Sequence, residues 1–137
     1  MKKNIILAIV GVVFMLGLVG CPQEEAWQTG APSDITGKIW VDTVTTTSST
    51  RSVQYNKWDA DGTRYTKMVT LYNDETTDLA TKAKTKTWST ASVYSIAKYR
   101  TGEVETTTGT KYKYTISGGH MSWEDWFTCD ETTDVVD

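Results

Sequence analysis

The amino-acid sequence predicts an all-β fold, an antiparallel up-and-down meander of about eight short strands that closes as a barrel or folds as a β-sandwich. Threonine is the compositional outlier, with twenty-five residues, and seven Tyr and six Trp accompany it. These residue types suit a pleated, half-buried surface. Turn signals recur every 8 to 12 residues or so, a spacing typical of sandwiches and barrels. No helical crossover is expected, which argues against a parallel sheet.

Residues 1–20 have the form of a cleaved signal peptide. Lys2 and Lys3 precede an apolar run from Ile5 to Val19. A run of this length fits the apolar core of a secretory signal, whereas a membrane-spanning helix usually needs about 20 apolar residues. The sequence therefore predicts export and removal of this segment.

The end of the run, "LVGC", resembles the lipobox of bacterial lipoproteins, with Leu18, Gly20 and Cys21 at the motif positions. The resemblance implies that Cys21 carries a diacylglyceryl group and an acylated amine, with chains such as palmitate, which anchor a protein stably when two or more are present. Pro22 rather than Asp follows Cys21, so the enterobacterial signal for retention in the inner membrane is missing. We expect a cell-envelope protein on the outer membrane or cell surface; the alternative is an ordinary signal peptide with a coincidental cysteine.

Residues 21–34 are expected to form a lipidated tether, because two prolines and several polar residues separate the cysteine from the first strand. Trp27 is its one apolar landmark, and it could dock on the domain or touch the membrane interface. Loss of the signal peptide changes the formal net charge from −3 to −5, since two of the fourteen basic residues leave with it. An acidic chain is a poor partner for nucleic acid.

Eight strands are expected along the chain. The clearest turn is Asp59–Thr63, "DADGT", in which Asp side chains bond to the backbone and Gly62 supplies a positive φ. The expected strands are residues 35–47, 52–59, 64–72, 82–89, 92–100, 104–108, 110–117 and 120–127.

Residues 78–89 are the ambiguous segment of this pattern. Leu79 and Ala83 are spaced for a helix, whereas Thr85, Thr87 and Trp88 favour a strand. The strand interpretation is preferred from Lys82 onward.

The barrel domain is expected to span residues 35–128, and residues 129–137 to form an acidic tail. Six carboxylates and no basic residue lie between Glu124 and Asp137, which is typical of a solvated terminus. If Cys21 carries lipid, Cys129 has no partner within the chain for a disulfide. It is interpreted as an inert, half-buried thiol, because nothing nearby is basic enough to stabilise a thiolate; a cross-link between two chains is the alternative.

Three stretches of the domain resemble the short lipocalin-like domains of bacterial lipoproteins: "TGKIWV", with Gly37 and Trp40; the hairpin "WDADGT"; and the late hairpin "KYKYTISGGHMSW". Two residues rather than one separate Gly37 from Trp40, which departs from the glycine–tryptophan spacing of lipocalins. The resemblance implies a barrel with a central apolar cavity for a small ligand, and it does not imply an enzyme.

The leading function expected is non-enzymatic binding of a small, largely apolar ligand, with a structural or surface-interaction β module as the alternative. Aromatic residues line many ligand pockets. The first candidates here lie on the two arms of the late hairpin, and Trp88 is the next. The candidate ligand-binding residues are Trp88, Tyr112, Tyr114 and Trp123.

The sequence predicts no metal site, cofactor or catalytic residue. His120 is the only histidine, and "DADG" has glycine at the fourth position of a calcium-type loop rather than the sixth. Glu103 and Glu105 share a strand face, so weak glycoside hydrolase activity is a further alternative, since that chemistry uses two carboxylates about 5 to 9.5 Å apart. No protein partner can be named from the sequence.

Overall fold

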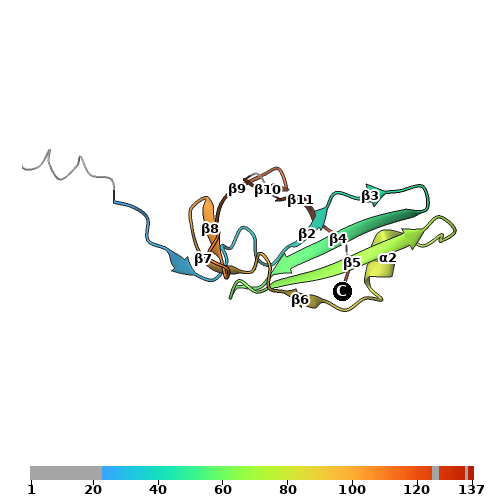
Figure 1. Ribbon diagram of the computed structural model, residues 1–137, viewed down its shortest axis with the longest axis horizontal. Helices are drawn as coiled ribbons and strands as arrows, with labels where there is room; N and C mark the ends of the chain where they lie inside the picture. The colour runs from blue at the N-terminus through green and yellow to red at the C-terminus, as the bar shows by residue number, and fades with distance from the viewer. Residues whose placement is uncertain (1–22, 125–126, 135) are drawn as a thin grey trace, which may run out of the picture.

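The structure is a computed structural model that describes residues 23–124, 127–134 and 136–137. The expected signal peptide and the predicted lipid-bearing Cys21 lie outside the described residues. The described chain is all-β, with one antiparallel sheet curled into a half-barrel, so the predicted fold class is confirmed (Figure 1). No helix in the described ranges has the length and apolar character needed to cross a membrane.

Eleven strands make up the sheet, and eight of them contain four residues or more, in agreement with the predicted number of about eight. The three short strands, β1, β3 and β6, were not expected separately. β11 was not expected either, because the sequence predicted a single strand over residues 120–127 followed by a tail. The strands are β1 (Gln28–Thr29), β2 (Ile39–Asp42), β3 (Thr45–Thr46), β4 (Thr50–Trp58), β5 (Arg64–Tyr72), β6 (Ser89–Ala91), β7 (Ile96–Arg100), β8 (Glu103–Thr106), β9 (Lys111–Ser117), β10 (His120–Trp123) and β11 (Phe127–Thr132).

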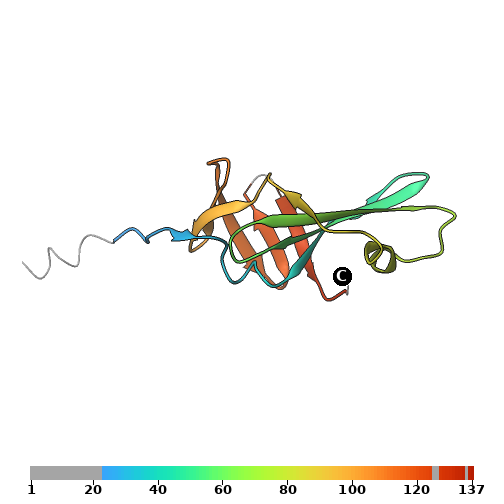
Figure 2. The ribbon, with the colours of Figure 1, turned by 90° about the horizontal axis from the view of Figure 1, so that it is seen from below.

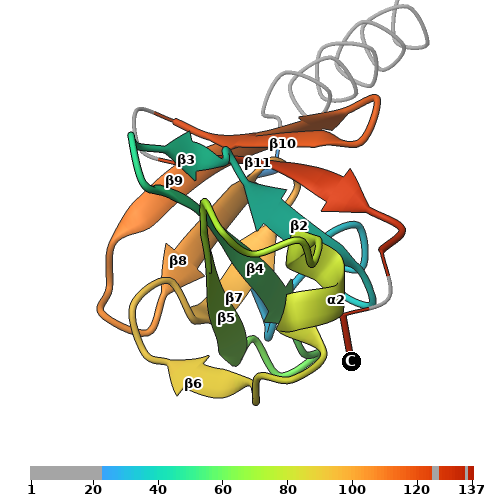
Figure 3. The same ribbon diagram turned by 90° about the vertical axis from the view of Figure 1, so that its right-hand side faces the viewer.

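The strand order is that of a meander whose first long strand, β2, pairs with its last, β11. The full order is β1-β7-β8-β9-β10-β11-β2-β4-β5-β6, with β3 beside β4. β6 lies at one end of this order and β7 near the other, so the curl stays open between two strands that are consecutive in the chain. Seen along the long axis, the strands curve around a common interior (Figure 3).

The turn between β4 and β5 reaches across to β7. It is the predicted turn at Asp59–Thr63, with Thr63 N donating to Asp61 Oδ1 at 2.8 Å. Ile96 N then donates to Gly62 O at 2.8 Å. Gly62 has a φ of 89°, and a Cβ on it would lie 1.8 Å from Ile96 O. Only glycine allows these two backbones to approach so closely.

The concave side of the sheet is filled by aromatic side chains. Trp40, Trp58 and Trp123 are fully buried there, and Trp40 Nε1 donates to Ile35 O at 2.9 Å. Packed rings therefore occupy the middle of this side, where the lipocalin-like resemblance implies an apolar cavity. The concave cluster consists of Ala31, Ile35, Trp40, Trp58, Ile96, Val104, Tyr114, Met121, Trp123 and Cys129, with Tyr94, Tyr99, Tyr112, Ile116 and Phe127 packed against it.

The opposite face of β2, β4 and β5 is covered by the helix α2 (Leu79–Ala83) and by the chain end, where Val136 is fully buried. The outer cluster consists of Val53, Tyr55, Val69, Ala83 and Val136, with Ile39, Val41, Leu79, Ala80 and Trp88 packed against it. The prediction of a strand from Lys82 to residue 89 was wrong for all but its last residue, because Asp78 caps a helix and residues 84–88 form no strand after it. Asp78 Oδ1 accepts from Thr81 N at 2.8 Å. Only Ser89–Ala91 forms a strand here.

The ends of the domain differ from the expected boundaries. Residues 129–132, assigned to the acidic tail from the sequence, belong to β11 and pair with β2. At the other end, β1 pairs with β7, and Gly30 N donates to Ala97 O at 3.0 Å. The described part of the tether is therefore docked on the domain, with β1 beside β7 at one end of the elongated molecule (Figures 1 and 2).

Candidate functional site

Three of the four predicted ligand-binding residues come together on the concave side of the sheet. Tyr112, Tyr114 and Trp123 belong to the concave cluster or pack on it, whereas Trp88 packs on the outer cluster. The pairing of β9 with β10 places Trp123 directly opposite Tyr114. The predicted set is thus split between the two faces of the sheet.

Trp123 and Tyr112 are part of the ring packing. Trp123 is 1% exposed, and its ring centroid lies 5.6 Å from that of Tyr112, 5.9 Å from Trp58 and 6.3 Å from Tyr94. Separations of about 4.5 to 7 Å are typical of favourable aromatic pairs. Both side chains therefore hold the interior together.

Trp88 has a different setting on the outer side of the sheet. Lys57 Nζ lies 4.6 Å and Lys67 Nζ 4.8 Å from its ring centroid. Its indole nitrogen donates to Asp137 Oδ1 at 2.5 Å. Trp88 thus ties the chain end to the strands by cation–π and hydrogen-bond contacts.

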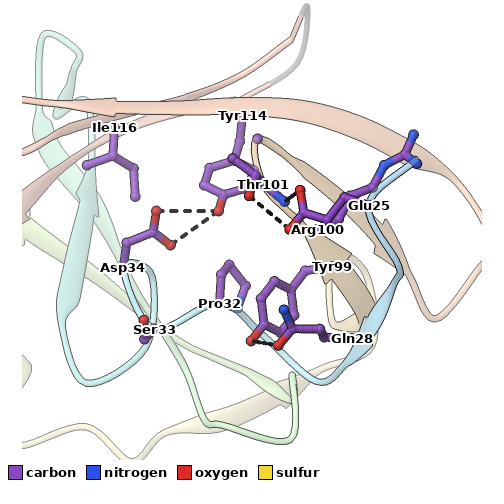
Figure 4. A pocket seen from close by; sticks show the side chains of 11 residues that line it. Glu25, Gln28, Pro32, Ser33, Asp34, Tyr99, Arg100, Thr101, Tyr114 and Ile116 are labelled. Carbon is purple, nitrogen blue, oxygen red and sulfur yellow. Dashed lines mark hydrogen bonds between the residues drawn. The ribbon is translucent and has the colours of Figure 1, made fainter. Parts of the chain in front are cut away.

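Tyr114 lines a pocket of about 330 Å³, here called the Tyr114 pocket (Figure 4). One wall comes from the docked tether, and the other comes from the end of β7, the following turn and β9. The lining residues are Glu25, Gln28, Pro32, Ser33, Asp34, Tyr99, Arg100, Thr101, Gly102, Tyr114 and Ile116.

Hydrogen bonds hold the polar groups of the pocket in place. The Tyr114 hydroxyl donates to the two Asp34 carboxylate oxygens at 3.2 and 3.4 Å, and the Tyr99 hydroxyl donates to Gln28 Oε1 at 3.0 Å (Figure 4). Burial, and then the Asp34 carboxylate, raise the pKa of Tyr114 above its ordinary value. Tyr114 is therefore a hydrogen-bond donor at every physiological pH.

Charged groups fasten the tether to the rim of the pocket. Glu25 accepts from Thr101 N at 3.1 Å and from Thr101 Oγ1 at 2.9 Å. Arg100 binds Glu24, and it donates to Glu103 Oε2 at 2.5 Å. The hydrogen bond from Arg100, followed by its charge, lowers the pKa of Glu24. These contacts hold the tether against the end of β7 and the turn that follows it, so that the tether wall of the pocket is fixed in place.

Trp27, which the sequence could not place, docks on the outside of the same strands. Lys98, Arg100 and Lys111 lie over its ring, at 5.3, 4.7 and 5.4 Å from the centroid. These contacts add to the backbone pairing of β1 with β7 and position the pocket wall.

The Tyr114 pocket combines apolar surfaces with hydrogen-bond acceptors. The rings of Tyr99, Tyr114 and Pro32 and the side chain of Ile116 supply the apolar surfaces, and the Asp34 carboxylate supplies acceptor oxygens. Such a lining, largely pre-formed and with a few placed polar groups, is typical of small-molecule sites. It suits binding of a molecule with an apolar face and hydrogen-bond donors.

The two glutamates considered for glycoside hydrolysis lie outside this pocket. Glu105 lies 3.2 Å from Lys98 Nζ and 4.0 Å from Lys111 Nζ, and Glu103 pairs with Arg100. Each carboxylate is thus matched by a cation on a neighbouring strand. Within the described part of the chain, no group of three or more His, Cys, Asp or Glu side chains is arranged to hold a metal ion.

Two groups of this site were missed in the sequence. Asp34 lies in the segment that was assigned to the tether, and the composition of that segment gave no sign that it would contact a strand. Tyr99 did carry a signal, because it was expected on an alternating strand face, and the pairing of β7, β8 and β9 places it in line with Val104 and Tyr112.

Comparison of the chain with protein-family models, curated proteins and solved structures finds no match.

Proposed function

We propose that this protein is a lipid-anchored binding protein of the bacterial cell envelope, which holds a small ligand without chemical change in the Tyr114 pocket. The observation that carries the proposal is the set of polar groups in the pocket wall, which are held by partners within the protein. A wall fixed in this way loses little entropy when a ligand binds.

The ligand class follows from the lining. Asp34 offers acceptor oxygens next to two phenol rings, Pro32 and Ile116. We therefore propose a molecule with one apolar face and at least one hydrogen-bond donor, which is more polar than the largely apolar ligand expected from the sequence.

The lipid anchor is proposed from the lipobox alone. Because the tether is docked on the domain, the position of Cys21 in the chain limits how far the Tyr114 pocket can lie from the lipid. Glu25 lines the pocket and lies four residues after Cys21. Four residues span at most about 14 Å. A lipid on Cys21 would thus keep the ligand site beside the headgroups, on the outer membrane or cell surface.

The lipocalin-like resemblance remains part of the proposal. What supports it is the meander order and the pairing of β2 with β11, because an up-and-down barrel joins its first and last strands in this way. The buried Trp40, near the start of the first long strand, is a second point of similarity.

A second candidate is a surface-interaction module without a small ligand. Its support is the packed concave cluster, together with exposed apolar side chains on the half of the molecule away from the tether. Val44, Met68 and Tyr72 are the exposed residues there.

Native mass spectrometry of the detergent-extracted protein tests the leading proposal. Wild type should carry a small molecule, and Asp34→Asn should lower its occupancy by a factor corresponding to about tenfold or more in affinity, since a charge-assisted hydrogen bond contributes about 1.5–3 kcal/mol. Asp130→Asn is the control, because Asp130 is exposed and lies outside the pocket. Equal loading of both variants, or a wild-type protein that carries nothing, would contradict the proposal.

A further inference from the structure

A second pocket, of about 410 Å³, lies beside β4 and β5, toward the end where Thr50 pairs with Tyr72 and away from the Asp59–Thr63 turn. It is here called the Asp42 pocket. It is separate from the Tyr114 pocket, with which it shares no residue. Its size is within the range of small-molecule sites, roughly 300 to 1,000 Å³. The lining residues are Asp42, Thr43, Thr45, Ser52, Val53, Gln54 and Met68.

A buried network holds the Asp42 carboxylate. Asn56 Nδ2 donates to Asp42 Oδ1 at 2.9 Å. The Asn56 carbonyl in turn accepts from Arg64 at 2.5 Å and from Gln54 Nε2 at 3.0 Å. Asn56 is 0% exposed and Arg64 is 5% exposed. The carboxylate is therefore oriented by groups that cannot turn away into water.

Arg64 is the member of this network whose burial costs the most free energy, because it carries a charge. Its guanidinium carbon lies 5.6 Å from the ring centroid of Trp58 and 5.7 Å from that of Phe127, and its NH1 donates to Val93 O at 3.2 Å. A buried charge is expensive unless it is paired and hydrogen-bonded. Burial lowers the pKa of Arg64, while the charge of Asp42 raises it. A guanidinium stays charged in proteins, and Arg64 is linked to the Asp42 carboxylate through the Asn56 side chain. Burial raises the pKa of Asp42, whereas the Arg64 charge and the hydrogen bond from Asn56 lower it.

The Asp42 pocket is lined by one carboxylate, one side-chain amide, three hydroxyl groups and the apolar residues Val53 and Met68. The Gln54 amide nitrogen is used by Asn56, so its carbonyl oxygen is the end that it can offer to a ligand. Ser52 and Thr70 hydroxyls bond to one another at 2.9 Å. Met68, which is 60% exposed, forms an adaptable apolar wall. The lining contains a carboxylate and no Lys, Arg or His.

We propose that the Asp42 pocket is a binding site for small organic cations of the alkylammonium class. The ammonium group binds the Asp42 carboxylate and the Gln54 carbonyl oxygen, and the alkyl chain lies against Met68. A bare metal ion fits less well, because it needs several charged or carbonyl oxygens at short distance and would leave most of the pocket unfilled. The inference does not depend on the ligand proposed for the Tyr114 pocket.

Saturation-transfer NMR with butylammonium chloride tests the proposal on the full chain in a non-ionic detergent at low ionic strength. We expect saturable binding of butylammonium to wild type and at least about tenfold weaker binding to Asp42→Asn, as for loss of a charged partner. The amide oxygen of Asn can still accept from Asn56, so this variant keeps the network. Asp130→Asn, at an exposed position outside both pockets, should bind butylammonium as wild type does. Asp34→Asn reports any binding of the cation in the Tyr114 pocket.

Two further measurements keep the result decisive. The neutral probe 1-butanol should bind at least about tenfold more weakly than butylammonium, because it lacks the charge that Asp42 recognises. Met68→Trp should also weaken binding, by filling the pocket from an exposed position that leaves the network intact. Binding unaffected by both substitutions, or no butylammonium binding to wild type, would overturn the proposal, whereas a change with Asp34→Asn alone would place the cation in the Tyr114 pocket.

Discussion

Cys129 shows how its surroundings set the reactivity of a single side chain. It is 2% exposed, and its backbone lies opposite Asp42 in the pairing of β11 with β2. Burial raises the pKa of the Cys129 thiol, and the nearby Asp42 and Asp130 carboxylates raise it further. Since the thiolate is the reactive form, the folded protein keeps this cysteine inert, as the sequence suggested for a different reason.

Alkylation should measure this protection. In the Cys21→Ser variant, Cys129 is the one remaining thiol of the chain. Iodoacetamide at pH 8 should leave it unmodified in the native state and modify it fully in denaturant, as read by intact mass. Because its folded pKa lies above the unfolded value of about 8.5, this group contributes stability that is present below pH 8.5 and falls as the pH rises further. Rapid native labelling would contradict this account.

Residue roles could be predicted from sequence only where local alternation decides them. Tyr112 and Tyr114 were expected on a strand next to that of Trp123, and the β9–β10 pairing brings these side chains to the same side of the sheet. Trp88 lies on the other face of the sheet, and local alternation could not show this, because its place depends on the last residues of the chain and on two lysines from distant strands. Asp34 depends on an even longer-range contact, with Tyr114.

At the level of elements, the turn between β4 and β5 has the greatest consequence. It ends one hairpin, and through Gly62 it also bridges toward β7 across the open side of the curl. The local turn was predictable from "DADGT", whereas the contact with Ile96 was not, because it joins residues far apart in the chain.

Two glycine substitutions separate the contribution of the Gly62–Ile96 hydrogen bond to stability from the cost of placing a side chain at a positive φ. Gly62 and Gly109 have nearly equal φ values, 89° and 86°, but a Cβ on Gly109 meets nothing within 4 Å. Gly109→Ala should cost on the order of 1 kcal/mol in unfolding free energy for its positive φ. Gly62→Ala should cost at least about 1 kcal/mol more, because it also breaks the bond to Ile96. Urea unfolding would measure both, and equal midpoints would show that the bridge contributes nothing.

Helix α2 illustrates the limit of periodicity as a signal. Its five residues make little more than one turn, so no repeating apolar face could appear in the sequence. The cap formed by Asp78 and Thr81 is the local feature that could have predicted it.

For the whole molecule, the chief unexpected feature is that the tether is part of the domain. A polar segment with two prolines is typical of a flexible spacer, yet residues 28–31 bond to β7 and to Ala60. The partners on β7 lie some seventy residues further along the chain, and no local pattern predicts such pairing. The all-β class and the meander were predictable because they follow from alternation and turns alone.

Membrane fractionation tests the anchor that is proposed to hold this assembly. Cys21→Ser should move the protein out of the membrane fraction while leaving its thermal unfolding unchanged, because the thiol that would bear the lipid is removed. Ser33→Ala is a matched control beyond the lipobox, at an exposed position. A mature, cleaved Cys21→Ser protein that stays with the membrane would count against lipid anchoring.

The docked segment also determines how the molecule would carry a mechanical load. Residues 23–27 run into β1 along nearly the same line (Figure 1), and the β1 backbone pairs side by side with β7. A pull along that line strains the inter-strand bonds together, in shear, and not one after another as in unzipping. Under such a force, the first region to deform would be the β1–β7 pairing at Gln28 and Tyr99, and the packed tryptophans would bear little of the load.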